Sequence, residues 1–386
     1  MLLSFLKKTL FFSLLLFSQL ISAQTLPCKE VIGYYPNWQW YDRSKLVNPM
    51  TIDYSKYTII NYAFFKPEAS GAISSTDSWS DDNLLNGQPN WAQGGYYPNT
   101  SIVSRAHNAG VKILPSIGGW TLSNNFPTIA ANATTRTAFA NACVALVQQY
   151  NFDGIDIDWE YPGYSPNSGT AADKQNYTLF LQAIRASLNT LGAQNGKSYL
   201  LTACFGASQT NMTNVEWANV APLLDCINLM SYDFFGTWDA TTNHNSPLYA
   251  PAQGDPTFNI NSAVNSLLTT YNVPANKICA GLAFYGRSHI TPSTPTLHGA
   301  GTGQADKVTF SIDDGSPLFY NILQKQNLFN KYTDNLAASP YLLGKNGLKT
   351  FVSYDDTASI ATKATYIKNK NLRGCIIWEI TCNVSI

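Results

Sequence analysis

Short runs of β-branched and aromatic residues alternate with longer stretches of helical periodicity along most of the chain. Eight runs are expected to be strands, at residues 31–35, 57–65, 111–116, 152–158, 199–205, 226–232, 278–284 and 374–378. Between them, apolar residues recur at the spacing of amphipathic helices over residues 135–150, 172–191, 261–271 and 358–370. This alternation predicts a parallel sheet of the α/β class, and eight units predict a closed (β/α)8 TIM barrel. An open doubly wound sheet is the alternative, but no G-x-G-x-x-G turn follows a strand.

The last two predicted strands lie farther apart than one connecting helix requires. Between them are strand-like segments at 310–314 and 341–343 and a helix-like segment near 317–326. We therefore expect a small α+β insertion at about residues 288–348, between strands 7 and 8. Only eight residues follow Trp378. Either the barrel closes without a final helix or the sequence is truncated.

Residues 1–23 have the pattern of a secretory signal peptide. Lys7 and Lys8 precede an apolar run at 9–21, and Ala23 provides a small-residue cleavage site before Gln24. The run is shorter than the roughly 20 residues that a membrane-spanning helix needs. We expect cleavage near Ala23-Gln24 and a catalytic chain of residues 24–386 that is secreted, to the periplasm or outside the cell, without a membrane anchor. An uncleaved anchor is the alternative.

The composition is low in charge and rich in aromatic residues. Of the 386 residues, 12% are charged and 13% aromatic, and 24 basic groups balance 24 acidic ones. This balance argues against a nucleic-acid partner, whose phosphates require a cationic surface, and favours a neutral ligand that stacks on rings, such as a sugar. Seven widely spaced cysteines and four histidines predict mostly free thiols and neither a metal centre nor a cofactor.

The fourth predicted strand carries acidic residues at every second position. Asp156, Asp158 and Glu160 share one face of the strand, with neighbours about 6.5 Å apart. Three ionised carboxylates inside a barrel are costly, so we expect a shared proton between Asp156 and Asp158, and a general acid at Glu160 near the open rim. A magnesium or calcium site is the alternative. Asp153 is out of phase and is expected to be structural.

The acidic run Asp153-x-x-Asp156-x-Asp158-x-Glu160, followed by Tyr161-Pro162, resembles the signature of glycoside hydrolase family 18, the chitinases. Further segments resemble the family in the same order along the chain, at residues 33–38, 61–64, 116–120, 230–233, 281–287 and 378–379. The resemblance spans residues 31–379. It departs from the family pattern after the eighth strand, where the segment that usually follows this strand in the family is shortened.

The resemblance implies hydrolysis of chitin or chito-oligosaccharides by a retaining mechanism in which the substrate's acetamido group is the nucleophile, without a metal. Glu160 would be the acid and base, Asp158 would bind the acetamido N–H, and Asp156 would hold the proton that lets Asp158 turn. Tyr232 would hydrogen-bond the acetamido oxygen and Asp233 would steady the sugar.

The resemblance also implies an aromatic cleft. Trp378 would form its floor, Arg287 would face the substrate unless it makes a structural ion pair, and Met230 would pack beneath the site. Walls and stacking platforms are expected from Tyr34, Trp38, Phe64, Trp120 and Trp238.

The insertion would wall one side of the cleft and favour processive or chain-end attack. We expect a monomer. Two other functions remain open: an endo-acting N-acetylglucosaminidase on N-linked glycans, and a chitin-binding lectin without catalysis. The insertion argues against the first, and the presence of Glu160 argues against the second.

Overall fold

The computed structural model describes residues 29–312 and 314–383. The predicted signal peptide lies outside the described residues, as does Cys28. Within the described ranges, every helix is too short or too polar to cross a bilayer.

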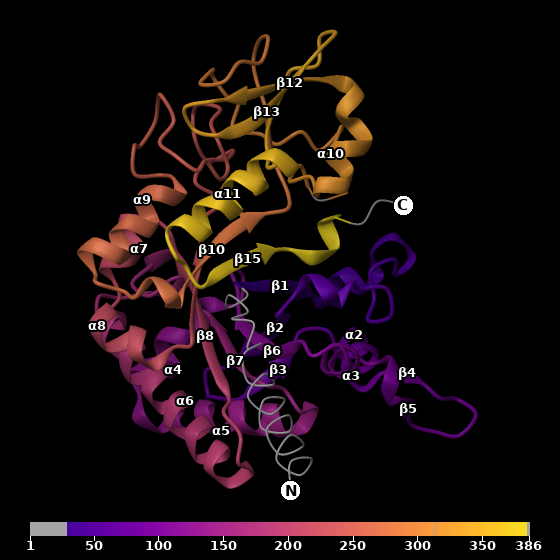
Figure 1. Ribbon diagram of the computed structural model, residues 1–386, viewed down its shortest axis with the longest axis vertical. Helices are drawn as coiled ribbons and strands as arrows, with labels where there is room; N and C mark the ends of the chain where they lie inside the picture. Colours follow the sequence, from indigo (N-terminus) through magenta and orange to yellow (C-terminus); the bar gives the residue numbers. More distant parts are fainter. Residues whose placement is uncertain (1–28, 313, 384–386) are drawn as a thin grey trace, which may run out of the picture.

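Eight parallel strands form a closed barrel (Figure 1). The last strand pairs with the first as well as with its predecessor in the sheet, and the first also pairs with the second, which closes the ring. The predicted (β/α)8 barrel is therefore confirmed, and the eight expected strands all form. They are β1 (Glu30–Pro36), β2 (Ile59–Pro67), β6 (Lys112–Gly118), β7 (Gly154–Asp158), β8 (Leu200–Gly206), β9 (Cys226–Met230), β10 (Ile278–Ala283) and β15 (Gly374–Trp378).

The helices follow the strands and cover the outside of the barrel. The four helices expected from periodicity correspond to α5 (Ala133–Tyr150), α6 (Asp173–Asn195), α9 (Ile260–Asn265) with its continuation η8 (Ser266–Thr270), and α11 (Thr357–Asn369). Their ends follow local chemistry: the Asn132 side chain accepts the Thr134 amide at the start of α5, and Asn151 ends it in the left-handed conformation. Shorter helices are α2 (Ser78–Asp81), α3 (Ile102–Asn108), α4 (Phe126–Ala131), α7 (Gln209–Thr213) and α8 (Trp217–Val220).

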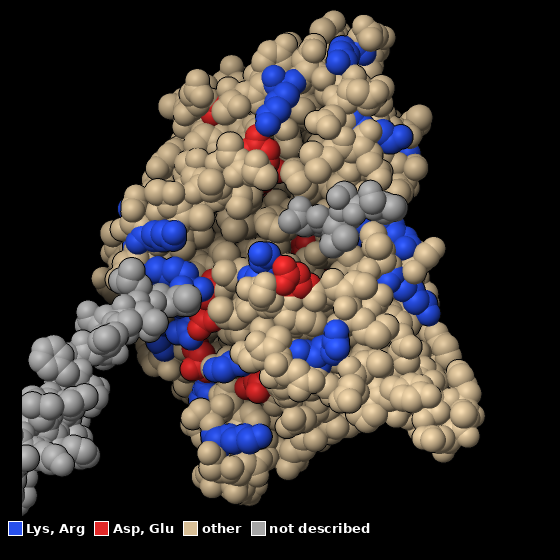
Figure 2. Space-filling view, turned by 45° about the vertical axis from the view of Figure 1, so that its right-hand side comes forward, with Lys and Arg blue, Asp and Glu red and all other residues tan. Residues whose placement is uncertain are grey.

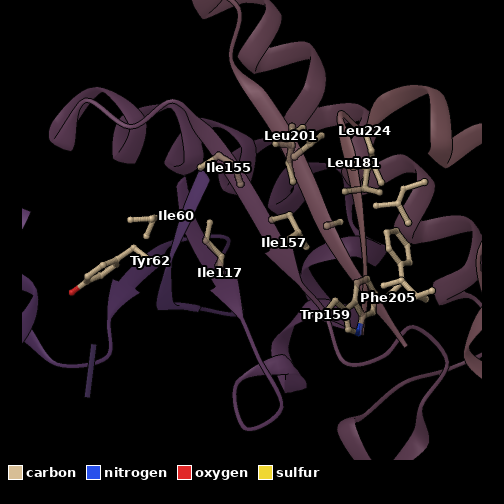
Figure 3. Close-up of a cluster of buried hydrophobic side chains, with 14 of the residues drawn as sticks. Ile60, Tyr62, Ile117, Ile155, Ile157, Trp159, Leu181, Leu201, Phe205 and Leu224 are labelled. Carbon is tan, nitrogen blue, oxygen red and sulfur yellow. The ribbon is translucent and has the colours of Figure 1, made fainter. Parts of the chain in front are cut away.

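Two layers of side chains pack on opposite faces of the barrel strands. Outward-facing residues of β7 and β8, including Ile155, Ile157 and Leu201, pack with the helices in the main hydrophobic core (Figure 3). Inward-facing residues form a separate cluster that contains Ile32, Leu114 and Cys204. This alternation explains how one strand can supply both packing residues and polar groups.

An edge strand and a small hairpin stand beside the barrel. The antiparallel strand β3 (Ile73–Ser75) extends the barrel sheet next to β2, and β4 (Gln88–Pro89) pairs with β5 (Tyr96–Tyr97) in a projecting hairpin (Figure 1). After β15 the described chain ends in the single turn η11 (Ile380–Asn383).

The expected insertion is present between β10 and α11 and lies over one end of the barrel (Figure 1). Its antiparallel sheet has the order β11 (Arg287–Ile290), β14 (Thr350–Ser353), β13 (Ser339–Gly344), β12 (Phe329–Asp334), and its helix is α10 (Phe319–Lys325). The expectation of a strand at 310–314 is wrong. The described residues of that segment form turns and a bend. Phe310 packs into the insertion's core, and the Asp306 carboxylate accepts the amides of Val308 and Thr309, which shapes the turn before it.

A buried ion pair lies at the start of α11, and its lysine also binds the loop after β9. Lys363 Nζ lies 2.5 Å from Asp355 Oδ2 and 2.6 Å from the carbonyl oxygen of Ser246, and both charged side chains are 1% exposed. Removing one partner of such a pair leaves an uncompensated buried charge.

We therefore expect Lys363→Met to lower the free energy of unfolding, measured with urea, by about 3–5 kcal/mol. The matched control is Lys331→Met, because Lys331 pairs with Asp356 at 2.5 Å but is 56% exposed. That change should cost less than about 1 kcal/mol. Equal losses in the two variants would contradict the assignment.

Candidate active site

The carboxyl groups of β7 lie at the centre of the barrel, as the strand's alternation predicts. Asp156 and Asp158 are buried on its inner face, and Glu160 follows two residues beyond Asp158. Asp153 lies at the other end of the strand, where its Oδ2 is 2.9 Å from His107 Nε2 and accepts the amide of Ile113. The expected structural role of Asp153 therefore agrees with its contacts.

The turn after β6 brings a second segment against these carboxyls. Gly118 has a φ of 116°, and a Cβ at this position would collide with the carbonyl oxygen of Asp158. Next to it, the hydroxyl of Ser123 accepts the backbone amide of Glu160 at 2.9 Å. The glycine therefore permits the close approach of the two segments at the backbone just before Glu160.

Asp156 is held by hydroxyl and amide donors from four different strands, and the Cys204 thiol lies 3.9 Å from its Oδ2. Its Oδ2 accepts the hydroxyls of Tyr34 at 3.0 Å and Ser116 at 2.7 Å. Its Oδ1 accepts Asn228 Nδ2 at 3.0 Å and the hydroxyl of Thr202. Burial raises the pKa of Asp156, and these hydrogen bonds oppose the rise.

Asp158 has a different environment, although it is buried to a similar degree. Its Oδ1 is enclosed and has no hydrogen-bond partner. Burial, followed by the negative charges of Glu160 and Asp156, raises the pKa of Asp158 well above its usual range, and a hydrogen bond with Cys204 opposes this rise. The donors around Asp156 favour its ionised form, whereas burial and the neighbouring negative charges favour the protonated form of Asp158.

Glu160 is half-buried at the mouth of the barrel. Burial raises the pKa of its carboxyl to about 7, and the negative charge of Asp233 adds to this rise. Hydrogen bonds with the side chain of Tyr161 and the backbone of Trp120 lower the pKa and so oppose the rise. A carboxyl group with a pKa near neutrality can both donate and accept a proton under physiological conditions.

Tyr232 and Asp233 follow directly after β9, so the predicted strand to residue 232 is two residues too long. Asp233 Oδ1 accepts the hydroxyl of Tyr285 at 2.6 Å and Arg287 Nε at 2.8 Å, and its Oδ2 lies 2.7 Å from Arg287 Nη2. Arg287 therefore makes the structural ion pair that was one of its two expected roles. The pair also holds the guanidinium beside the predicted sugar-binding residues. The ring of Tyr232 lies 6.1 Å from that of Tyr285, centroid to centroid.

Four of the predicted aromatic residues form one continuous cluster around Trp378. The Trp378 ring stacks on Phe64 at 5.7 Å with an interplanar angle of 18°, and lies 5.7 Å from the Tyr34 ring and 6.3 Å from the Trp38 ring. Met230 is buried in the same interior cluster. Since Tyr34 also donates to Asp156, the aromatic surface and the carboxyl groups are directly linked.

Trp120 and Trp238 lie at the rim and are more exposed than Trp378. Trp120 is 53% exposed and its ring is 5.6 Å from that of Tyr164. Trp238 is 58% exposed and lies under the Arg287 guanidinium, 5.2 Å from ring centroid to Cζ. On the face drawn in Figure 2, uncharged residues cover most of the surface, and Lys, Arg, Asp and Glu are scattered among them. The exposed rings of Trp120 and Trp238 can contact the apolar faces of sugar rings.

The comparison of the whole sequence with known families agrees with the acidic residues found inside the eight-stranded barrel. A sequence model described as Glycosyl hydrolases family 18 matches residues 30–382. The chain belongs to glycosyl hydrolase family 18. The resemblance seen in the acidic run is therefore confirmed over almost the entire described chain.

Relatives of this family 18 protein include chitinases from several kingdoms. Chitinase A1 of Niallia circulans is 36% identical, with 93% of this chain and 57% of that protein aligned. Chitinase 1 of Aphanocladium album is 32% identical, with 99% and 90% aligned. Catalytic domain 2 of the Ostrinia furnacalis Group II chitinase, solved as a mutant in complex with penta-N-acetylchitooctaose, superposes with a TM-score of 0.81 at 28% identity, covering 92% of this chain and 90% of that one. The chain thus spans little more than half the length of one curated relative and most of another.

Several residues that support the site were not predicted from the sequence. Ser116, Thr202 and Asn228 are polar residues at inward positions of apolar strands, and this unusual placement was an available signal. Tyr161 and Tyr285 contact Glu160 and Asp233 through loops, for which no periodic signal exists. Over the ranges that the structure describes, no three His, Cys, Asp or Glu side chains gather closely enough to hold a metal ion.

Proposed function

We propose that this family 18 protein is an exported chitinase that hydrolyses β-1,4 bonds between N-acetylglucosamine units. One observation carries the proposal: the buried Asp158 carboxyl has an oxygen without a partner, next to Glu160, whose pKa is raised to about 7 by burial. The first group can accept an N–H from a substrate, and the second can donate a proton. The chitinase relatives support the same substrate class.

The reaction requires one nucleophile that the protein itself does not supply. Glu160 donates its proton to the glycosidic oxygen as the bond from that oxygen to the anomeric carbon breaks. The carbonyl oxygen of the substrate's own 2-acetamido group forms the new bond to the anomeric carbon, giving an oxazolinium ion. Asp158 accepts the acetamido N–H and stabilises the positive charge of this ion. Glu160 then removes a proton from the water that opens the ring, and the configuration is retained.

The remaining residues orient the sugar. Tyr232 donates to the acetamido oxygen, and Asp233, fixed by Tyr285 and Arg287, contacts the sugar at the rim. The Trp378 ring, stacked on Phe64, supports the apolar face of the sugar at the cleaved bond. Trp38, Trp120 and Trp238 provide exposed rings for neighbouring sugar units, and the insertion favours processive or chain-end attack.

The rate should depend on pH through Glu160. Because the acid must be protonated and its pKa is about 7, kcat/KM should fall tenfold per pH unit once the pH rises well above about 7. Initial rates on a soluble chito-oligosaccharide between pH 4 and 9 measure this limb. A rate that is unchanged up to pH 9 would contradict a raised pKa at Glu160.

Product analysis tests the proposal against its alternatives. The protein is incubated with N-acetylglucosamine hexamer and, separately, with a glycoprotein that carries N-linked glycans. A chitinase shortens the hexamer and leaves the glycoprotein intact. Release of glycans would favour an endo-acting N-acetylglucosaminidase, and binding of the hexamer without any cleavage would favour a lectin.

A further inference from the structure

Asp233 has an unusual backbone conformation at the rim of the site. Its φ is 57°, in the left-handed region that residues other than glycine seldom occupy. A residue keeps such a conformation when the surrounding structure holds it there. The contacts that hold the Asp233 backbone therefore also decide where its carboxylate lies.

A buried asparagine in the loop after β9 supplies these backbone contacts. Asn245 is 0% exposed, and its Oδ1 accepts the backbone amide of Asp233 at 2.9 Å. The main-chain carbonyl oxygen of Asn245 accepts the next amide, that of Phe234, at 3.0 Å. Two successive amides after β9 thus end on Asn245, a residue that neither the proposed chemistry nor the aromatic cleft uses.

The insertion supports Asn245 from the other side. The backbone amide of Asn245 donates to Ser353 Oγ at 2.7 Å, and Ser353 is buried on β14. In the insertion's sheet, Ser353 lies opposite Arg287 of β11. Arg287 in turn binds both carboxylate oxygens of Asp233, at 2.8 and 2.7 Å. Asp233 is therefore fixed at its amide and at its carboxylate, and both lines of contact lead to paired residues of one sheet.

Asp233, Asn245, Ser353 and Arg287 form a closed ring of contacts, which we call the positioning ring. We propose that Asn245 is a positioning residue, which couples the seating of the insertion on the barrel to the place of the Asp233 carboxylate in the site. The kinetic consequence rests on the proposed function, whereas the coupling itself is a property of the free protein. A purely stabilising role is the simple alternative, since a buried hydrogen-bonded asparagine contributes to stability wherever it lies.

The kinetic test uses Asn245→Leu, which keeps the approximate size of the side chain and removes the acceptor for the Asp233 amide. Because Asp233 steadies the sugar, KM for a chito-oligosaccharide should rise by about 3- to 10-fold, the effect of losing one hydrogen bond. A variant that is only destabilised contains fewer active molecules, which lowers kcat and leaves KM unchanged. A wild-type KM in Asn245→Leu would therefore overturn the proposal.

Asn243→Leu is the matched control from the same loop. Asn243 is also buried, and its side chain accepts the amide of His244 at 2.9 Å and donates to the carbonyl oxygen of Gln253 at 2.8 Å. These hydrogen bonds stay within the loop. Asn243→Leu should lower the melting temperature as Asn245→Leu does, but leave KM within about twofold of wild type. Equal rises of KM in the two variants would contradict a specific role of Asn245.

A double-mutant cycle shows whether Asn245 acts through Asp233. Once Asp233→Ala has removed the carboxylate, adding Asn245→Leu should change KM no further, because both changes disturb the same contact with the sugar. Effects that multiply would overturn the proposal. If Asn245→Leu does not fold, Ser353→Ala carries the same cycle from the insertion's side of the positioning ring. It should raise KM in the native background and not beside Asp233→Ala, and a wild-type KM would overturn the coupling.

Crystal structures without any sugar test the coupling apart from catalysis. In Asn245→Leu, we expect the φ of Asp233 to leave the left-handed region or its carboxylate to separate from Arg287, whereas Asn243→Leu keeps both features. An unchanged Asp233 in Asn245→Leu would refute the proposal. A displaced Asp233, in a protein whose wild type cleaves no chito-oligosaccharide, would support the coupling and refute only the proposed function.

Discussion

Replacing Glu160 with Gln is expected to lower kcat for hydrolysis of chito-oligosaccharides by about 10²- to 10⁴-fold, the usual contribution of a general acid. The amide has the shape of the carboxyl group but cannot deliver a proton to the glycosidic oxygen. Binding should survive, because the aromatic cluster around Trp378 is unchanged. Tryptophan fluorescence provides the binding measurement, since Trp38 and Trp378 both lie at the site.

Glu68→Gln is the matched control for this variant. Glu68 lies directly after β2 on the surface, where it pairs with Lys66 at 3.0 Å, and should tolerate the same change of charge with wild-type kcat. If Glu160→Gln also kept wild-type turnover, Glu160 would not be the acid.

The second large effect is expected for Asp158→Asn, with kcat lowered by about 10²- to 10³-fold, as for the loss of one preorganised group that stabilises transition-state charge. Asparagine cannot compensate the positive charge of the oxazolinium ion. It can also present its NH2 group to the acetamido N–H, where a donor faces a donor. Steady-state kinetics on the hexamer measure the loss.

Asp153→Asn removes a carboxylate from the same acidic run and serves as the comparison. Asp153 contacts His107 and the Ile113 amide, away from Glu160, so kcat should stay within about threefold of wild type even if stability falls. Similar kinetic losses in the Asp153 and Asp158 variants would mean that the effect is structural and not catalytic.

The barrel was predictable because its signals are local and repeated. Each strand is a short run of β-branched or aromatic residues, and strands such as 278–283 and 374–378 formed within one residue of the expected limits. The inward placement of Asp156 and Asp158 followed from the twofold alternation of a strand, with Ile155 and Ile157 on the helical side.

What could not be predicted depends on contacts between segments that are distant in the chain. The bidentate pair of Asp233 with Arg287 joins residues 54 positions apart, and Tyr34 reaches Asp156 across 122 positions. Neither pairing has a periodic signature. Phe310 was misread as part of a strand because one buried aromatic residue in a turn resembles the apolar half of a short strand.

The surroundings of Cys204 show the same limit on a smaller scale. In the sequence it is one apolar residue of a strand-like run, and burial alone agrees with that interpretation. Only the distances to Tyr34 and Asp156 place its sulfur among the carboxyl groups.

In the proposed reaction, the substrate's acetamido group is the nucleophile, assisted by Asp158 and Glu160. The most direct measurement compares initial rates on two hexamers of equal length, one fully N-acetylated and one fully deacetylated. We expect rapid cleavage of the acetylated hexamer and no detectable cleavage of the deacetylated one, because a free amine has no carbonyl oxygen to attack the anomeric carbon. Equal rates on the two hexamers would contradict it.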